Sequence, residues 1–190
     1  MDPILFATTV CAPPGTRIHT LSVQVKLDRP WEEAVFSAGT NIGSRDNPRK
    51  WQIPSVWKVG DLYLPTGTGE VCEELILFNY TPDNGSWLRQ LFFGRKPTSG
   101  GTWFTALAWA ASLGLKRTVP REVFAVAEQH PTLPQTLGVD SMTALATTEC
   151  TFNDQRQACG VWWGGPLSTG ALLTPISSAI HPRVWFAFKR

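Results

Sequence analysis

The side chains best suited to covalent or metal chemistry are four cysteines, Cys11, Cys72, Cys150 and Cys159. None of them forms a C-x-x-C pair, the spacing that holds structural zinc, so the sequence does not favour a zinc site. Cys150 and Cys159 lie symmetrically about a turn-forming segment, FNDQRQ (152–157), and we expect them to face each other across two paired strands. They would form a disulfide in an oxidising compartment and stay buried thiols in a reducing one.

The histidines His19, His130 and His181 are far apart and lack the H-x-x-x-H and H-E-x-x-H spacings of metalloenzymes. His130 precedes Pro131, and we expect it to end a helix, where the helix dipole favours a cation. We expect His181 to contact a ligand.

Motifs for phosphate or calcium binding are incomplete. Thr66-Gly67-Thr68-Gly69 lacks the Lys of a phosphate-binding loop. In residues 142–190, only Glu149, Asn153 and Asp154 offer the carboxylate and amide oxygens that calcium prefers. The sequence therefore predicts no catalytic residue, no metal ligand and no cofactor, and any ligand binding is expected to be independent of calcium.

Composition excludes some classes of protein. The chain has 190 residues, a net charge of +2 and no basic run, so a nucleic-acid partner is not expected. No apolar run approaches the roughly 18 residues of a membrane span. The N-terminus opens with Asp2 and lacks the basic start of a secretory signal, so we expect a cytoplasmic or virion-associated protein.

Hydrophobic periodicity predicts the elements that must position any site. Residues 18–27 alternate as a strand, 30–39 fit a short helix or turn, 40–70 read as irregular, 73–80 form a strand, and 87–93 form a strand or helical turn. Two helices are predicted at 102–113 and 119–129, with Thr118 as the cap of the second. Their expected buried stripes are Phe104, Leu107, Ala108 and Ala111, and Val119, Val123, Val126 and Ala127. Strands follow at 142–152, 157–163, 170–177 and 183–190, and antiparallel pairing is expected.

The segment 164–184 has an unusual composition. It contains no Lys, Glu, Gln, Trp or Met, although these five types occur 30 times in residues 1–163, a rate that predicts about four in this window. Its Gly, Ser, Thr and Pro content is typical of a loop, yet its only charge is Arg183. Such a stretch fits either an exposed contact patch or a buried strand pair broken by Gly and Pro.

The order strand, helix, helix and strands, ending in the blocks Val161-Trp162-Trp163 and Val184-Trp185-Phe186-Ala187-Phe188, resembles the C-type lectin fold. It most resembles the variable proteins of diversity-generating retroelements. In these proteins adenine-directed mutagenesis turns Asn-type codons into codons that cannot encode the five residue types missing from the window. Residues 114–129 are also similar to the second-helix region of sulfatase-modifying proteins. The resemblance implies an α+β, C-type lectin-like fold in which two helices pack on antiparallel strands, with 73–80 pairing with 183–190.

The resemblance covers residues 73–190, which would form the lectin-like domain with a variable region at 160–190. Residues 1–72 would be an irregular, β-rich N-terminal extension packed on it. The implied scaffold residues are Trp162, Trp163, Trp185, Phe186 and Phe188. The implied variable, ligand-binding residues are Gly164, Leu167, Thr169, Ala171, Leu173, Thr174, Ile176, Ser177, Ser178, Ile180, His181, Arg183 and Val184.

Three functions follow as hypotheses. The first is a display protein whose diversified surface binds a protein or a cell-surface ligand. Its variable side chains must face solvent, because surface changes usually cost only about 0.5 kcal/mol. The second is an enzyme of the formylglycine-generating type with Cys150 or Cys159 as a reactive thiolate, which would need a low pKa and access to solvent. The third is an interaction protein without diversification.

Overall fold

The computed structural model describes residues 16–39, 52–80, 103–164, 168–178 and 183–190, with only the backbone at 52–54, 80 and 178. The expected strand at 87–93, the cysteine Cys11 and the predicted ligand-binding residues Leu167, Ile180 and His181 lie outside the described residues, as does the side chain of Ser178.

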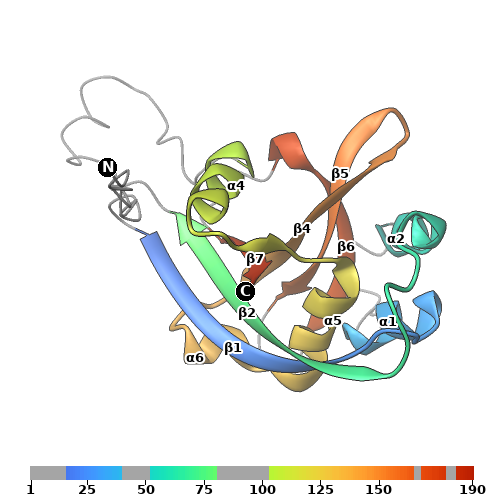
Figure 1. The fold of residues 1–190 in the computed structure, drawn as a ribbon, viewed down its shortest axis with the longest axis horizontal. Coiled ribbons are helices and arrows are strands. Elements are labelled where there is room, and N and C mark those ends of the chain that lie inside the picture. Colours follow the sequence, from blue (N-terminus) through green and yellow to red (C-terminus); the bar gives the residue numbers. More distant parts are fainter. Residues whose placement is uncertain (1–15, 40–51, 81–102, 165–167, 179–182) are drawn as a thin grey trace, which may run out of the picture.

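One mixed sheet and a few short helices make up the fold (Figure 1). The elements, in chain order, are β1 (Thr16–Lys26), α1 (Trp31–Ser37), α2 (Gln52–Lys58), the 3-10 helix η1 (Gly60–Leu62), β2 (Glu70–Tyr80), α4 (Trp103–Ser112), β3 (Lys116–Arg117), α5 (Pro120–Gln129), α6 (Leu133–Thr136), β4 (Met142–Phe152), β5 (Gln155–Trp163), β6 (Thr169–Pro175), η2 (Ile176–Ser178) and β7 (Val184–Lys189). The α+β class is therefore confirmed.

The last strand of the chain lies in the middle of the sheet. The strand order is β1-β2-β7-β4-β5-β6, and the short β3 also pairs with β7. β7 runs antiparallel to β2, with Leu77 opposite Ala187, and parallel to β4, with Ala144 opposite Trp185. The predicted pairing of 73–80 with 183–190 is confirmed. The parallel contact with β4 was not predicted, because sequence neighbours indicate only hairpin pairing.

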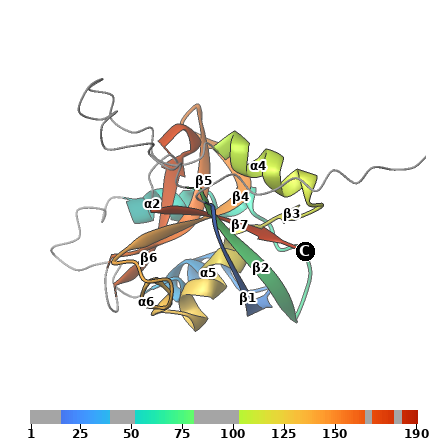
Figure 2. The same cartoon turned by 90° about the vertical axis from the view of Figure 1, so that its left-hand side faces the viewer.

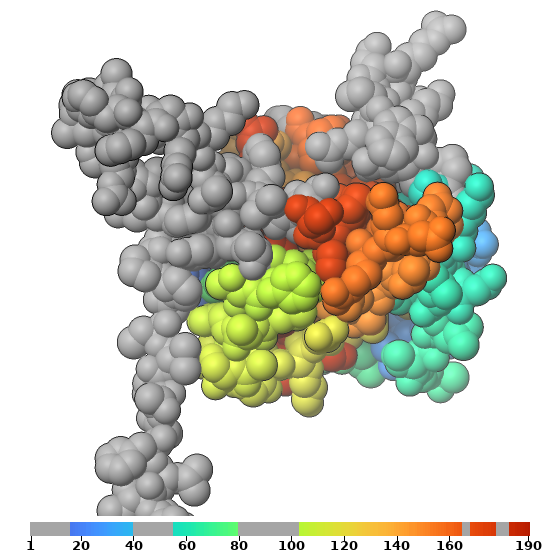
Figure 3. Space-filling model, turned by 90° about the horizontal axis from the view of Figure 1, so that it is seen from above, coloured from blue at the N-terminus to red at the C-terminus, as the bar shows by residue number. Residues whose placement is uncertain are grey.

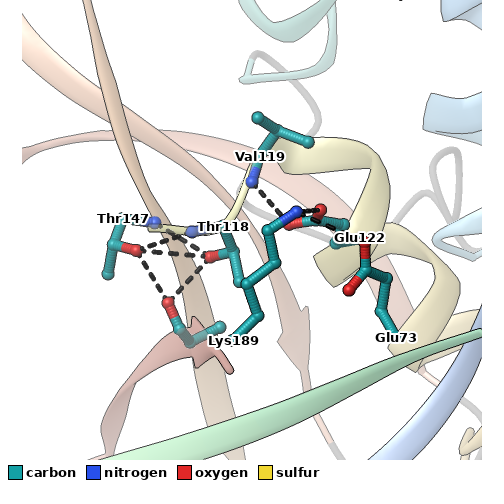
Figure 4. Close-up of polar contacts among 7 residues, drawn as sticks. Glu73, Thr118, Val119, Glu122, Thr147 and Lys189 are labelled. Atoms are coloured by element: carbon teal, nitrogen blue, oxygen red, sulfur yellow. Dashed lines mark hydrogen bonds and ion pairs between the residues drawn. The ribbon is translucent and has the colours of Figure 1, made fainter. Parts of the chain in front are cut away.

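Two threonines fix β7 beside β4 (Figure 4). The hydroxyl groups of Thr118 and Thr147 both donate to the carbonyl oxygen of Ala187, at 2.7 and 2.8 Å. Thr147 lies where the pairing of β4 with β5 shifts register, between Leu145 and Glu149. The predicted helix cap at Thr118 is wrong, because its hydroxyl donates its hydrogen bond to the Ala187 carbonyl oxygen of β7 and not to α5. Instead, the Glu122 carboxylate accepts the Val119 backbone N–H at 2.8 Å.

An ion-pair group holds the end of β7 to the start of α5. The Lys189 ammonium contacts the carboxylates of Glu122 and Glu73, and Glu122 is almost fully buried. Burial raises the pKa of Glu122 above its ordinary value of 4.5, and the Lys189 charge lowers it only in part. The folded state therefore binds this proton more readily than the unfolded state.

The sheet separates two hydrophobic clusters. Figure 2 shows α5 on one side of the sheet and α4 on the other. One face is covered by α1, α2 and α5, and its cluster includes Val35, Val56, Val123 and Trp185. The other face is covered by α4, whose Trp103 and Trp109 pack with β2 and β7. The larger cluster joins residues from both expected parts of the chain, and the boundary at 72 and 73 falls inside β2.

The two helices predicted from the sequence are present as α4 and α5, but α4 buries a different side from the one predicted. The buried side chains of α4 are Trp103, Ala106, Trp109 and Ala110. The predicted stripe is wrong, because Phe104, Ala108 and Ala111 are exposed and Leu107 is half-buried. Phe104 lies 5.5 Å from the guanidinium of Arg156, where Figure 3 shows α4 beside the β4–β5 hairpin. In α5 the predicted Val123, Val126 and Ala127 are buried, and Val119 is half-buried.

The position of β7 predicts a contrast between two phenylalanines. Phe188→Ala should lower the free energy of unfolding by about 3–5 kcal/mol, because it empties a buried site against Trp109. Phe104→Ala, the matched exposed change, should alter it by about 0.5 kcal/mol or less. Urea unfolding followed by circular dichroism measures both. Similar losses at the two positions would contradict the burial of β7.

The ion-pair group predicts a dependence on pH. Lys189→Met should lower the free energy of unfolding at pH 7 by about 3 kcal/mol, because it leaves the buried Glu122 carboxylate without its cation. The loss should shrink as the pH falls toward 4.5, because a protonated Glu122 needs no counter-charge. Urea titrations of both proteins between these pH values check this. A loss that is constant with pH would argue against the pair.

Candidate ligand-binding surface

The predicted scaffold aromatics lie in the core. Trp163, Trp185, Phe186 and Phe188 are buried, and Trp162 is half-buried. Rings from α4 pack against this framework: Trp103 meets Phe186 edge-on at 5.9 Å and Trp109 meets Phe188 at 6.4 Å. Aromatic pairs at these separations stabilise a core beyond the area that they bury. The framework is therefore stiff.

This framework brackets the window 164–184. The sequence predicted that the ligand contacts in this window face solvent, but several of them do not. Thr169, Ala171, Leu173 and Ile176 are all buried, so the expectation that they are exposed, exchangeable ligand contacts is wrong. The cause lies in the N-terminal part of the chain, because α1 and α2 pack against β6. Ala171 and Leu173 belong to the same cluster as Ala34, Val35, Ala38, Val56 and Val59 of those helices and their ends. Ile176 packs into the cluster on the opposite face.

Gly164 is exposed but is not free to vary. A Cβ atom at this position would lie 2.0 Å from Cη2 of Trp162, far inside van der Waals contact. Any other residue would therefore have to displace a half-buried indole ring. Gly164 thus belongs with the framework.

The remaining predicted positions within the described residues do not form one surface. Ser177 and Arg183 are exposed, and Thr174 and Val184 are half-buried. Ser177 follows the end of β6, whereas Arg183 precedes β7 and donates to the Ser141 hydroxyl at 2.7 Å. These positions lie at opposite ends of the sheet, because β7 begins beside Thr143 and β6 ends beside Gln157.

The cysteine pair is not arranged for chemistry. Cys150 lies opposite Gln157 and not Cys159, so the predicted facing of the two cysteines is wrong; the two-residue turn at Asn153 and Asp154 pairs Phe152 with Gln155 and so sets this register. Both are free thiols and buried. Burial raises the pKa of each thiol, despite a nearby Tyr63 hydroxyl that lowers it. A thiolate is therefore disfavoured at both positions.

No group of three or more His, Cys, Asp or Glu side chains in the described part of the chain is arranged to hold a metal ion. Within the same residues, no helix has the length and apolar character needed to cross a membrane.

Exposed apolar side chains occur instead on α1 and α2, which pack against β6, and at the end of η1 and just after it. The described residues include seven large exposed apolar side chains, and four of them are Phe36, Trp57, Leu62 and Leu64. We call these four the outer helix surface. Phe36 and Trp57 pack together with ring centroids 5.8 Å apart, although they are 51% and 39% exposed. Exposed apolar clusters of this kind mark contact sites.

Buried contacts beneath this surface hold it rigidly. The Trp31 ring stacks on Tyr63 at 5.7 Å, and its indole N–H donates to the Val56 carbonyl oxygen at 2.9 Å. The Arg121 guanidinium lies 5.3 Å from the Trp31 ring centroid and donates to the Tyr63 carbonyl oxygen. A Cβ atom at Gly60 would lie 2.6 Å from the Trp31 ring, so only glycine allows η1 to approach so closely.

An open groove of about 550 Å³ adjoins the outer helix surface. Its lining residues, from β1, α1, α5 and the loop after β1, are Lys26, Asp28, Arg29, Pro30, Glu33, Phe36, Ser37 and Glu128. Arg29 forms a two-bond ion pair with Glu128, at 2.7 and 3.1 Å. Phe36 therefore belongs both to the groove and to the outer helix surface.

The sequence analysis missed this surface because residues 40–70 appeared irregular. Gly, Pro and Asn obscure α2, which contains Pro54 in its first turn, where proline is tolerated. Val56 and Val59, three residues apart, are buried on either side of the exposed Trp57. That spacing was the available signal of a helix packed on a core.

Comparison with known proteins gave no match: no family model, no curated protein and no solved structure resembles this chain.

The burial of β6 predicts opposite responses at two window positions. Leu173→Ala should lower the free energy of unfolding by about 2–5 kcal/mol, because it leaves a cavity beneath α1 and α2. Ser177→Ala, on the exposed side, should change it by about 0.5 kcal/mol or less. Differential scanning calorimetry distinguishes the two. An unchanged melting temperature in Leu173→Ala would instead support the prediction that the window faces solvent.

Proposed function

We propose that this chain is a ligand-binding protein of C-type lectin-like architecture and that the outer helix surface contacts its partner. The observation that carries the proposal is the contact between two exposed aromatic rings, Phe36 on α1 and Trp57 on α2, with the exposed Leu62 and Leu64 at and after η1. Rigid aromatic side chains in such positions supply binding energy at little entropic cost. The antiparallel pairing of β2 with β7 and the placement of α4 and α5 on opposite faces support the lectin-like part.

The window serves this function as framework. Exchange at Leu173 or Ile176 would cost far more than a surface change, and a side chain at Gly164 would require the Trp162 ring to shift. This favours an interaction protein with a constant sequence over one diversified along the whole window. Among the described positions, retroelement diversification would be limited to sites such as Thr174, Ser177 and Arg183.

The alternative of a thiol enzyme has less support. A catalytic thiolate needs a lowered pKa and a path to substrate. Burial raises the pKa of Cys150 and Cys159, and both are enclosed. The exposed Cys72 lies on β2 and is not among the residues that line the groove beside α1.

Selection from a library of random displayed peptides tests the proposal. Peptides enriched on the native protein should lose most of their affinity for Phe36→Ala and Trp57→Ala, because these changes remove the exposed rings. They should keep it for Phe104→Ala, which removes a still more exposed aromatic on α4. Isothermal calorimetry measures the affinities, and circular dichroism confirms that each variant is folded.

Failure to enrich any peptide, or equal affinity for Phe36→Ala and the native protein, would refute the outer helix surface as the binding site.

A further inference from the structure

We propose that the groove beside α1 takes a cationic side chain, of the guanidinium type, from an extended segment of the partner, with the Glu33 carboxylate and the Phe36 ring as its contacts. This inference rests on the proposed function, because Phe36 joins the groove to the outer helix surface. It adds the chemical class of the ligand.

The lining of the groove places an anion beside an aromatic ring. Glu33 and Phe36 are three residues apart on α1, so their side chains lie next to each other along the helix, and both line the groove. Ser37, which also lines it, donates its hydroxyl proton to the Ala34 carbonyl oxygen at 2.8 Å. The Ser37 oxygen keeps its lone pairs for a donor from a ligand.

Other charged groups in the groove, Arg29, Glu128 and Asp28, are held in ion pairs or hydrogen bonds. Arg29 is neutralised by Glu128, whose hydrogen bonds raise the pKa of the Arg29 guanidinium. A carboxylate oxygen of Asp28 accepts the Gly69 backbone N–H at 3.2 Å. The lining therefore carries three carboxylates against two cations, and Glu33 makes no ion pair or hydrogen bond within the described residues. The Glu33 carboxylate lies near enough to Arg29 to raise the pKa of that guanidinium, but Arg29 is already paired with Glu128, so the excess of carboxylates in the lining favours a cation.

The ring chemistry selects the kind of cation. An aromatic face attracts a cation placed over it, and a guanidinium group can stack on the ring while donating two hydrogen bonds to a carboxylate. The Phe36 ring is half exposed while its neighbour Trp57 supports it. The aliphatic stem of an arginine would extend over these rings, and a neighbouring apolar side chain would reach the outer helix surface.

Lys26 provides an internal test of the sign of charge. It lines the same groove and forms no ion pair within the described residues. If the ligand is cationic, Lys26 repels it slightly, and removal of Lys26 should leave affinity unchanged or improved. If the groove instead takes an anion, Lys26 is its attachment point and its removal weakens binding.

Nuclear magnetic resonance titration of the full chain with two matched peptides tests the inference. The probes are acetyl-Gly-Arg-Leu-Arg-Gly-amide and acetyl-Gly-Glu-Leu-Glu-Gly-amide. The arginine peptide should bind more tightly and shift the backbone amide signals of Glu33, Phe36 and Ser37. Added salt should weaken it, because part of the attraction is an exposed charge contact.

Variants on one helix provide the controls. Glu33→Gln should weaken the arginine peptide about threefold, whereas Glu32→Gln, which removes an exposed carboxylate that does not line the groove, should not. Phe36→Leu, which keeps apolar bulk but removes the ring face, should also weaken it. Lys26→Gln should cause no loss.

The outcomes separate the two proposals. Tighter binding of the glutamate peptide, or an unchanged affinity in Glu33→Gln, overturns the cationic ligand. If neither peptide shifts the groove signals but library peptides still require Phe36, this inference fails and the proposed function stands. If library peptides also ignore Phe36, both fail.

Discussion

The rest of the structure depends on the insertion of β7 between β2 and β4. This strand comes last in the chain but supplies the hydrogen bonds that join the β1–β2 hairpin to the three-stranded unit β4–β5–β6. Its backbone is fixed on one side by the Thr118 and Thr147 hydroxyls, and its end is fixed by the Lys189 ion pairs. β7 also contributes to the core on both faces of the sheet, since its Trp185 and Phe186 belong to the two opposite clusters.

With β7 central, β6 becomes an edge strand, and the N-terminal helices α1 and α2 cover it. This packing keeps the apolar side chains of Ala171 and Leu173 on β6 out of solvent. The apolar window is therefore shielded by a part of the chain distant in sequence, and apolar surface is presented instead by the outer side of the same helices. The structural and functional roles of the N-terminal part follow from one arrangement: its inner side stabilises β6, and its outer side offers Phe36 and Trp57.

Local patterns in the sequence identified most strands and helices but not their partners. Alternation defined β4, whose bounds match the prediction, and the Asn153-Asp154 turn has the positive φ angles that a tight hairpin needs. Helix α4 is apolar on all sides, so periodicity alone could not choose between Trp103 and Phe104, and packing against β7 decided it. The pairing of Cys150 with Gln157 follows from the position of the Asn153-Asp154 turn, whereas the register shift between Leu145 and Glu149 lies at Thr147, which is hydrogen-bonded to Thr118, 29 residues away. Burial of Leu173 depends on helices more than a hundred residues earlier, which no local pattern records.

Hydroxyl-radical footprinting of the native protein, with modification rates normalised to the unfolded chain, tests most directly whether the apolar window is buried beneath α1 and α2. The account predicts strong protection of Leu173 and little protection of Phe36 and Leu64. Rapid modification of Leu173 together with protection of Phe36 would mean that the window is the exposed face and the helices are not its cover.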